Sequence, residues 1–123
     1  MHGYDKKVAH HADNDTSSII HLLEQSRYDM HECFVTDPMV PITLAEGRKA
    51  LGDDIVIFGG VPSVILEATT SDEQFETYLA EIFDAVNPGD RFILGIADNM
   101  MPASMMSRVK RIGELAREQG SYP

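Results

Sequence analysis

Short apolar runs alternate with longer amphipathic segments along the chain. The apolar runs predict strands at residues 7–11, 30–35 and 55–58 and from residue 92 onward. Each run is followed by a segment that has the spacing or the start signals of a helix. A strand followed by a helix, four times in succession, predicts an α/β fold of about four consecutive parallel β/α units.

Two of the predicted helices carry clear start signals. Thr43 and Glu46 have the spacing of a capping box, and so do Ser71 and Gln74. The turn sequence 87–89 predicts the end of the third helix. The side chains predicted to face the core are Ile19, Ile20, Leu22 and Leu23 in the first helix, Phe75, Tyr78, Leu79, Ile82, Phe83 and Val86 in the third, and Met105, Val109, Ile112 and Leu115 in the last.

Chemically versatile residues stand where the predicted strands end. In parallel sheets the carboxyl ends of the strands share one rim, and ligands bind there. We therefore expect one rim to carry Asp13, Glu32, Gly59 and Asp98. The pair Gly59-Gly60 could let a substrate approach the backbone closely, although it lacks the spacing of a nucleotide-binding loop.

Composition narrows the classes of protein. A chain of 123 residues is long enough for one domain, and 20 acidic against 10 basic residues give a net charge of -10. This balance argues against nucleic acid and against anionic membrane surfaces. No apolar run approaches the roughly 18 residues of a membrane span. Cys33 is the sole cysteine, which excludes an internal disulfide and predicts a reducing, cytoplasmic location.

Each candidate residue has a functional and a purely structural interpretation. Asp13 and Asp98 are either metal ligands or ordinary cap and turn residues. Glu32 lies in an apolar strand, where it is either a general acid/base or an exposed residue at the strand end. Cys33 is either a nucleophile or, as most single cysteines are, a small buried apolar residue.

Three segments, residues 6–24, 43–66 and 89–118, resemble in the same order the C-terminal part of the uroporphyrinogen decarboxylase family. That superfamily also contains corrinoid-dependent methyltransferases. The resemblance implies a TIM (β/α)8-type barrel, of which this chain would form half. Residues 1–123 would then be a single partial-barrel α/β domain of a family barrel truncated on its N-terminal side.

The methyltransferase branch of this superfamily binds zinc through a His-x-Cys sequence and a second cysteine after the last strand. By position, His11 matches the histidine, Asp13 the first cysteine and Asp98 the second. Carboxylates in place of thiolates shift the expected divalent metal from Zn²⁺ toward Mn²⁺ or Mg²⁺. The resemblance also implies a corrinoid partner. Porphyrinogen decarboxylation is not expected, because the N-terminal half and the Gly-His-Gly segment of that branch are missing here.

Two hypotheses follow. In the first, the parent protein is an enzyme that acts on a small-molecule substrate, with a metal held by His11, Asp13 and Asp98 and protons moved by Glu32. In the second, the chain is a non-catalytic α/β module or a partial gene product. Under both hypotheses we expect the chain alone to be inactive. We also expect a homo-oligomer, because four strands cannot close an eight-stranded barrel.

Overall fold

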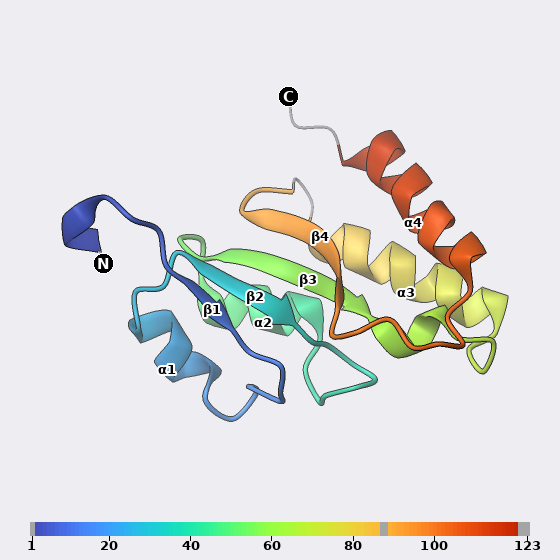
Figure 1. The fold of residues 1–123 in the computed structure, drawn as a ribbon, viewed down its shortest axis with the longest axis horizontal. Coiled ribbons are helices and arrows are strands. Elements are labelled where there is room, and N and C mark those ends of the chain that lie inside the picture. The colour runs from blue at the N-terminus through green and yellow to red at the C-terminus, as the bar shows by residue number, and fades with distance from the viewer. Residues whose placement is uncertain (1, 87–88, 121–123) are drawn as a thin grey trace.

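The computed structural model describes residues 2–86 and 89–120, which form a four-stranded parallel sheet and its helices (Figure 1). Neighbouring strands follow the chain order β1-β2-β3-β4, and every pair is parallel. The four predicted β/α units are therefore confirmed. The strands are β1 (Ala9–His11), β2 (Met30–Phe34), β3 (Val56–Pro62) and β4 (Phe92–Ala97), and the helices are α1 (Ile20–Gln25), α2 (Leu44–Leu51), α3 (Asp72–Ala85) and α4 (Met106–Gln119). Two 3-10 turns, η1 (His2–Tyr4) and η2 (Ser63–Leu66), complete the described elements.

All four helices pack on one face of the sheet. A single apolar core joins residues of every helix to Phe34, Ile57 and Val61 of the strands. The other face is not covered by any helix of the described chain, and it carries Phe58 and Ile93, of which Ile93 is 42% exposed. Sequential strand order with helices on one face is the winding of a barrel, because a doubly wound sheet places helices on both faces.

The helix starts agree with the sequence. Thr43 and Ser71 cap α2 and α3, and both capping boxes form with Glu46 and Gln74. The helix α3 ends at Ala85. Of the predicted stop at residues 87–89, the first two positions lie outside the described residues.

The inward faces of α1 and α4 differ from the prediction. In α1 only Ile20 and Leu23 are buried, while Ile19 and Leu22 are 43% and 53% exposed. The reason is that α1 has only six residues and lies beside the edge strand β1. A narrow stripe of apolar side chains on α1 is enough to cover this edge of the sheet. In α4, Met105 precedes the helix and is 37% exposed.

Arg108 is a buried residue of α4 that the apolar pattern did not include. Its guanidinium donates to the carbonyls of Ile65, Glu67 and Thr70 and to the carboxylate of Asp72, and it lies 4.9 Å from the ring centre of Phe75. Only 5% of Arg108 is exposed. Because a buried charge is tolerated only when it is paired and hydrogen-bonded, this cluster fixes α4 against the segment that leads into α3.

A β-bulge in β2 explains the first of the two glycines of β3. The pairing of β2 with β3 shifts between Glu32 and Phe34, and Cys33 takes a left-handed φ of 60°. Phe34 then lies against Gly59, where a Cβ would be 2.7 Å from the Phe34 nitrogen. The backbone that approaches Gly59 is therefore that of β2, not that of a substrate. Gly59 also lies inside β3, which continues to Pro62. The expectation that Gly59 lies at the rim is therefore wrong.

Aromatic rings and histidines pack together in β1 and β2. His31 is 2% exposed and meets the rings of His10 and Phe34 edge-on, with centroids 5.2 and 5.3 Å away. His10 in turn stacks on Tyr28. Burial lowers the pKa of His31 to about 4, the charge of a protonated His10 acts in the same direction, and Glu32 opposes both. His31 is therefore a neutral part of the core near pH 7.

We expect Gly59→Ala to destabilise the protein by roughly 2–4 kcal/mol, because a methyl group would meet the Phe34 backbone and the residue has a φ of 138°. Urea unfolding measures this loss. Gly113→Ala is the matched control: nothing lies within 4 Å of its added Cβ, and the helix should gain up to about 1 kcal/mol. Equal stability of the Gly59→Ala and wild-type chains would show that β2 does not approach β3 this closely.

We expect His31 to make the free energy of unfolding of the metal-free chain depend on pH. Unfolded His31 binds a proton near pH 6.5 and folded His31 only near pH 4, so its contribution is complete above pH 6.5 and is lost as the pH falls toward 4. The free energy of unfolding should change by about 1.4 kcal/mol per pH unit at most because of this residue. Urea unfolding in a chelator, compared between wild type and His31→Leu, isolates this part. His21→Leu, at an exposed position of α1, should keep the wild-type slope.

Candidate metal site at the strand ends

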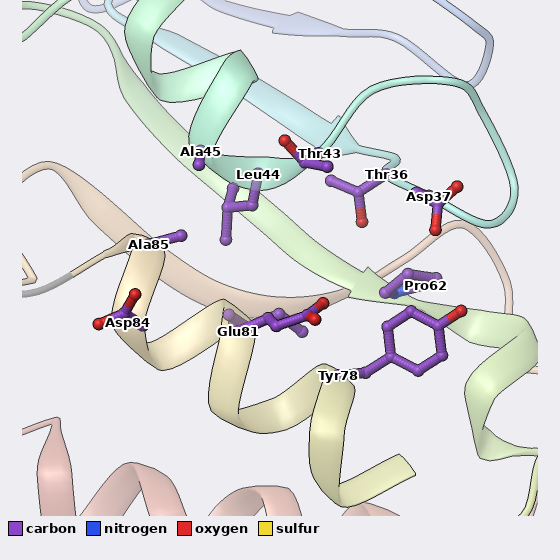
Figure 2. A pocket seen from close by; sticks show the side chains of 11 residues that line it. Thr36, Asp37, Thr43, Leu44, Ala45, Pro62, Tyr78, Glu81, Asp84 and Ala85 are labelled. Atoms are coloured by element: carbon purple, nitrogen blue, oxygen red, sulfur yellow. The ribbon is translucent and has the colours of Figure 1, made fainter. Parts of the chain in front are cut away.

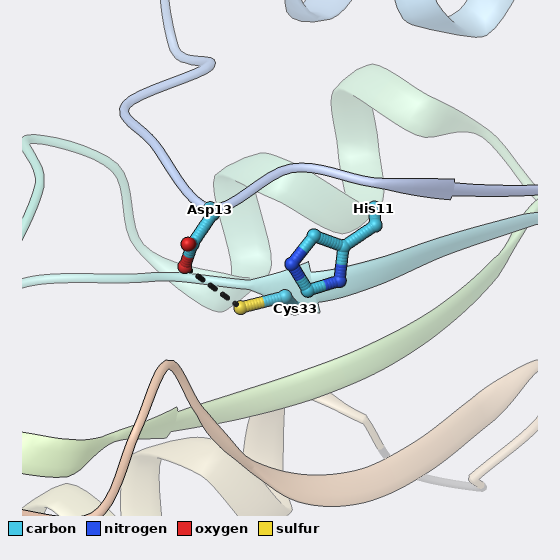
Figure 3. A group of neighbouring side chains, drawn as sticks. All are labelled: His11, Asp13 and Cys33. Carbon is cyan, nitrogen blue, oxygen red and sulfur yellow. Dashed lines mark hydrogen bonds between the residues drawn. The ribbon is translucent and has the colours of Figure 1, made fainter.

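Three side chains that can bind a metal meet near the carboxyl ends of β1 and β2 (Figure 3). His11 ends β1, Asp13 lies two residues further on, and Cys33 is the bulged residue of β2. One ligand atom from each lies within 4.8 Å of the other two. Bonds of the usual length place the ligands of a tetrahedral ion roughly 3.3–3.8 Å apart, so shifts of about 1 Å would close this group around a metal.

The bulge is what brings Cys33 into the group. In a regular strand, Glu32 and Cys33 would point to opposite faces of the sheet. The left-handed conformation of Cys33 breaks the alternation, so Glu32 contacts His11 and the Cys33 thiol also lies near that histidine. A non-glycine residue held in this region costs on the order of 1–3 kcal/mol, and such strain is concentrated at functional sites.

Glu32 determines which nitrogen of His11 is available. His11 and Glu32 are direct partners in the pairing of β1 with β2, and the Glu32 carboxylate hydrogen-bonds to Nδ1 of His11. This bond and the negative charge of Glu32 raise the pKa of His11. With Nδ1 engaged, Nε2 is the free nitrogen, and Figure 3 shows the imidazole directed toward Asp13 and Cys33. Metal-binding histidines are commonly held by a carboxylate in this way.

The Cys33 thiol has one donor and three carboxylates around it. It donates to Oδ1 of Asp13 over 3.8 Å, and its sulfur accepts the backbone N–H of Asp98 at 3.2 Å. Burial is the main cause that raises the pKa of Cys33, and Asp13, Glu32 and Asp98 add to it, while the Asp98 N–H lowers it. In these surroundings a thiolate needs a cation, which argues against a metal-free nucleophile.

Asp98 is adjacent to the group but is not one of its three members. It follows β4 with a φ of 65°, and its Oδ1 accepts the backbone N–H of Asn99 at 2.7 Å. Asp98 thus contributes a backbone donor to Cys33 and a negative charge nearby. The structure thus brings together His11 and Asp13, two of the predicted residues, and adds Cys33 to them. Glu32 contacts Nδ1 of His11 and is not itself one of the three.

The sequence contains one signal that places Cys33 in this group. Predicted ends of adjacent parallel strands lie side by side, so a cysteine at the end of β2 lies near the residues after β1. Strict alternation argued the other way, because it separated Cys33 from Glu32. Only the bulge removes this conflict.

A separate groove of about 330 Å³ lies between α2 and α3 (Figure 2). Apolar side chains of Leu44, Pro62 and Ile82 form part of its wall. The groove belongs to the helix side of the sheet and includes none of the candidate metal-site residues. Its acidic residues are Asp37, Glu81 and Asp84.

Fold and site together define an α/β protein whose parallel sheet carries a His-Asp-Cys group that could hold a metal ion. No model of a known family matches the chain. A comparison with curated proteins finds no match either. Among the helices described here, none has the length and apolar character needed to cross a membrane.

Proposed function

We propose that the chain is half of a (β/α)8-type barrel similar to the uroporphyrinogen decarboxylase and corrinoid-dependent methyltransferase superfamily. Its parent protein would act on a small molecule at a divalent-metal site on the carboxyl rim. The observation that carries the proposal is the contact of Glu32 with Nδ1 of His11, which leaves Nε2 for a metal beside Asp13 and Cys33. The one-sided winding of the sheet supports the barrel.

Zinc is the metal that this donor set suits best. Imidazole nitrogen, carboxylate oxygen and thiolate sulfur are all common zinc ligands, whereas Mn²⁺ and Mg²⁺ prefer oxygen. The family resemblance favoured the harder ions because it implied two carboxylate ligands, Asp13 and Asp98, and no thiolate. Three protein ligands leave a fourth tetrahedral position for a substrate or water, as in catalytic zinc sites. When bound there, zinc would act as a Lewis acid.

The remaining polar groups of the site position the ligands. Glu32, which the sequence suggested as a general acid/base, accepts the Nδ1 proton of His11 and holds the ring in place. The N–H of Asp98 donates to the sulfur of Cys33 and stabilises its thiolate. The chain thus supplies metal ligands and their supports, while a complete substrate pocket requires the other half of a barrel.

We expect the chain to bind one equivalent of Co²⁺, used as a spectroscopic substitute for zinc, with a thiolate-to-cobalt charge-transfer band. Cys33→Ser should abolish the band and most of the affinity. Glu32→Gln should weaken binding roughly 10–100-fold while keeping the band, because it disturbs only the support of His11. Absorption titrations measure both quantities.

Asp98→Asn is the matched variant, since it keeps the backbone N–H and should bind Co²⁺ nearly as well as wild type. A loss as large as that of Cys33→Ser would instead make Asp98 a ligand, as the family resemblance implies. Absence of Co²⁺ binding by the folded wild-type chain would contradict the proposal and favour the non-catalytic module.

We also propose that two copies associate through their sheet edges and enclose the uncovered sheet face. The outer edges of β1 and β4 have no partner strand among the described residues, and the face between them exposes Ile93 beside Phe58. A two-fold axis parallel to the strands would pair β4 of one copy with β1 of the other and keep all strands parallel. The result would be a closed sheet of eight strands, so that this symmetry removes both edges.

Sedimentation at micromolar concentration should therefore show a homodimer, with a total interface above roughly 2,000 Å². Ile93→Lys should shift it to monomer, because closure of the sheet would enclose the added charge on an apolar face. Leu22→Lys is the control, since Leu22 is 53% exposed on α1, on the helix side of the sheet, and its replacement should leave the dimer intact. A wild-type monomer at this concentration would refute the association.

A further inference from the structure

Negative charge is concentrated around the proposed metal site. Glu32 hydrogen-bonds to His11, Asp13 accepts from the Cys33 thiol, and the backbone N–H of Asp98 donates to the same sulfur, so all three acidic residues lie at the site. Asp13 and a Cys33 thiolate would neutralise a divalent ion. The charges of Glu32 and Asp98 then remain uncompensated. The open coordination position of the metal therefore lies in negatively charged surroundings.

Basic side chains of the described residues are directed elsewhere. Lys7 precedes β1 and pairs with Asp29, at the amino end of β2. Arg48 donates to the carbonyls of Ile55 and Arg91, at the amino ends of β3 and β4. Lys6, Arg27 and Arg91 also precede strands, and Lys49, Lys110, Arg111 and Arg117 belong to α2 and α4, on the other side of the sheet.

Arg108 is no exception to this separation. Although it starts near the carboxyl ends of the strands, only 5% of it is exposed, and its guanidinium is committed to the carbonyls and carboxylate that anchor α4. The described chain therefore offers no cation to a carboxylate or phosphate at the metal site. An anionic ligand would meet unfavourable charge without compensation.

The surface next to the site is apolar. Phe58 is the pairing partner of Glu32 in β3, and its ring packs over Gly95, where an added Cβ would lie 2.6 Å from the ring. Ile93 is the partner of Phe58 in β4 and is 42% exposed. Met30 is half-buried two residues before Glu32. This face can pack against an apolar ligand body beside the metal.

We infer that the open metal position takes a small organic cation with an apolar body, such as a protonated arylalkylamine, and discriminates against carboxylates and phosphates. The inference rests on the proposed metal site and adds the substrate class. Its physical basis is the charge of Glu32 and Asp98 combined with the apolar wall of Phe58 and Ile93.

The test uses three pyridines on the Co²⁺-loaded chain: 4-(aminomethyl)pyridine, 4-(hydroxymethyl)pyridine and pyridine-4-acetate. All bind a metal through the same ring nitrogen, and the para substituent carries a positive, zero or negative charge that cannot reach the same ion. The cobalt spectrum reports binding. We expect the amine to bind at least about tenfold more tightly than the acetate at low salt, and the ratio to shrink in roughly 0.5 M salt.

Asp98→Asn separates site charge from the intrinsic basicity of each pyridine. It should reduce the amine-to-acetate ratio about threefold, because one nearby charge is removed. Asp84→Asn, on α3 and on the other side of the sheet, should leave the ratio unchanged. Equal or tighter binding of the acetate, or a ratio insensitive to Asp98→Asn, would overturn the inference while the metal site stands. Failure of the wild-type chain to take up Co²⁺ would overturn both.

Discussion

The extra residue in β2 is the constraint on which the rest of this structure depends. Cys33 adopts a left-handed conformation, and the strand pairing resumes one residue later, at Phe34. Phe34 thereby returns to the helix side and becomes fully buried in the core. Cys33 joins the acidic group on the other side. A regular strand would have to give up either the core phenylalanine or the position of the thiol.

The neighbouring strand accommodates this bulge through its glycines. Gly59 lies where a side chain would collide with the Phe34 backbone, so β3 can approach β2 only because that residue has no Cβ. A pair of glycines at the end of an apolar run suggests a ligand site in the sequence. In the fold, Gly59 serves the close contact of two strands, and Gly60 leaves room for the side chains of Phe92 and Leu44. The bulge that needs Gly59 also places Cys33 beside His11 and Asp13.

Two features determine which chemical groups lie at the carboxyl rim: the register of the strands, and the placement of acidic and basic side chains at opposite ends of the sheet. Because His11 lies directly opposite Glu32, the imidazole has a fixed hydrogen-bond partner on one side and a free nitrogen on the other. The same register gathers carboxylates around a thiol, an arrangement that only a cation makes favourable. Basic side chains meanwhile bind carbonyls at the amino ends, as Arg48 does, or are buried for structural reasons, as Arg108 is.

The sequence by itself determined the order and type of the elements, because periodicity and capping are local properties: both capping boxes and all four strands lie where those patterns predict them. It also placed His11 and Asp13 at one strand end. Only the tertiary structure decided that Cys33 joins them, that Arg108 is buried, and that Gly59 serves strand packing. These outcomes depend on a bulge and on contacts between residues far apart in the chain, which no local pattern records.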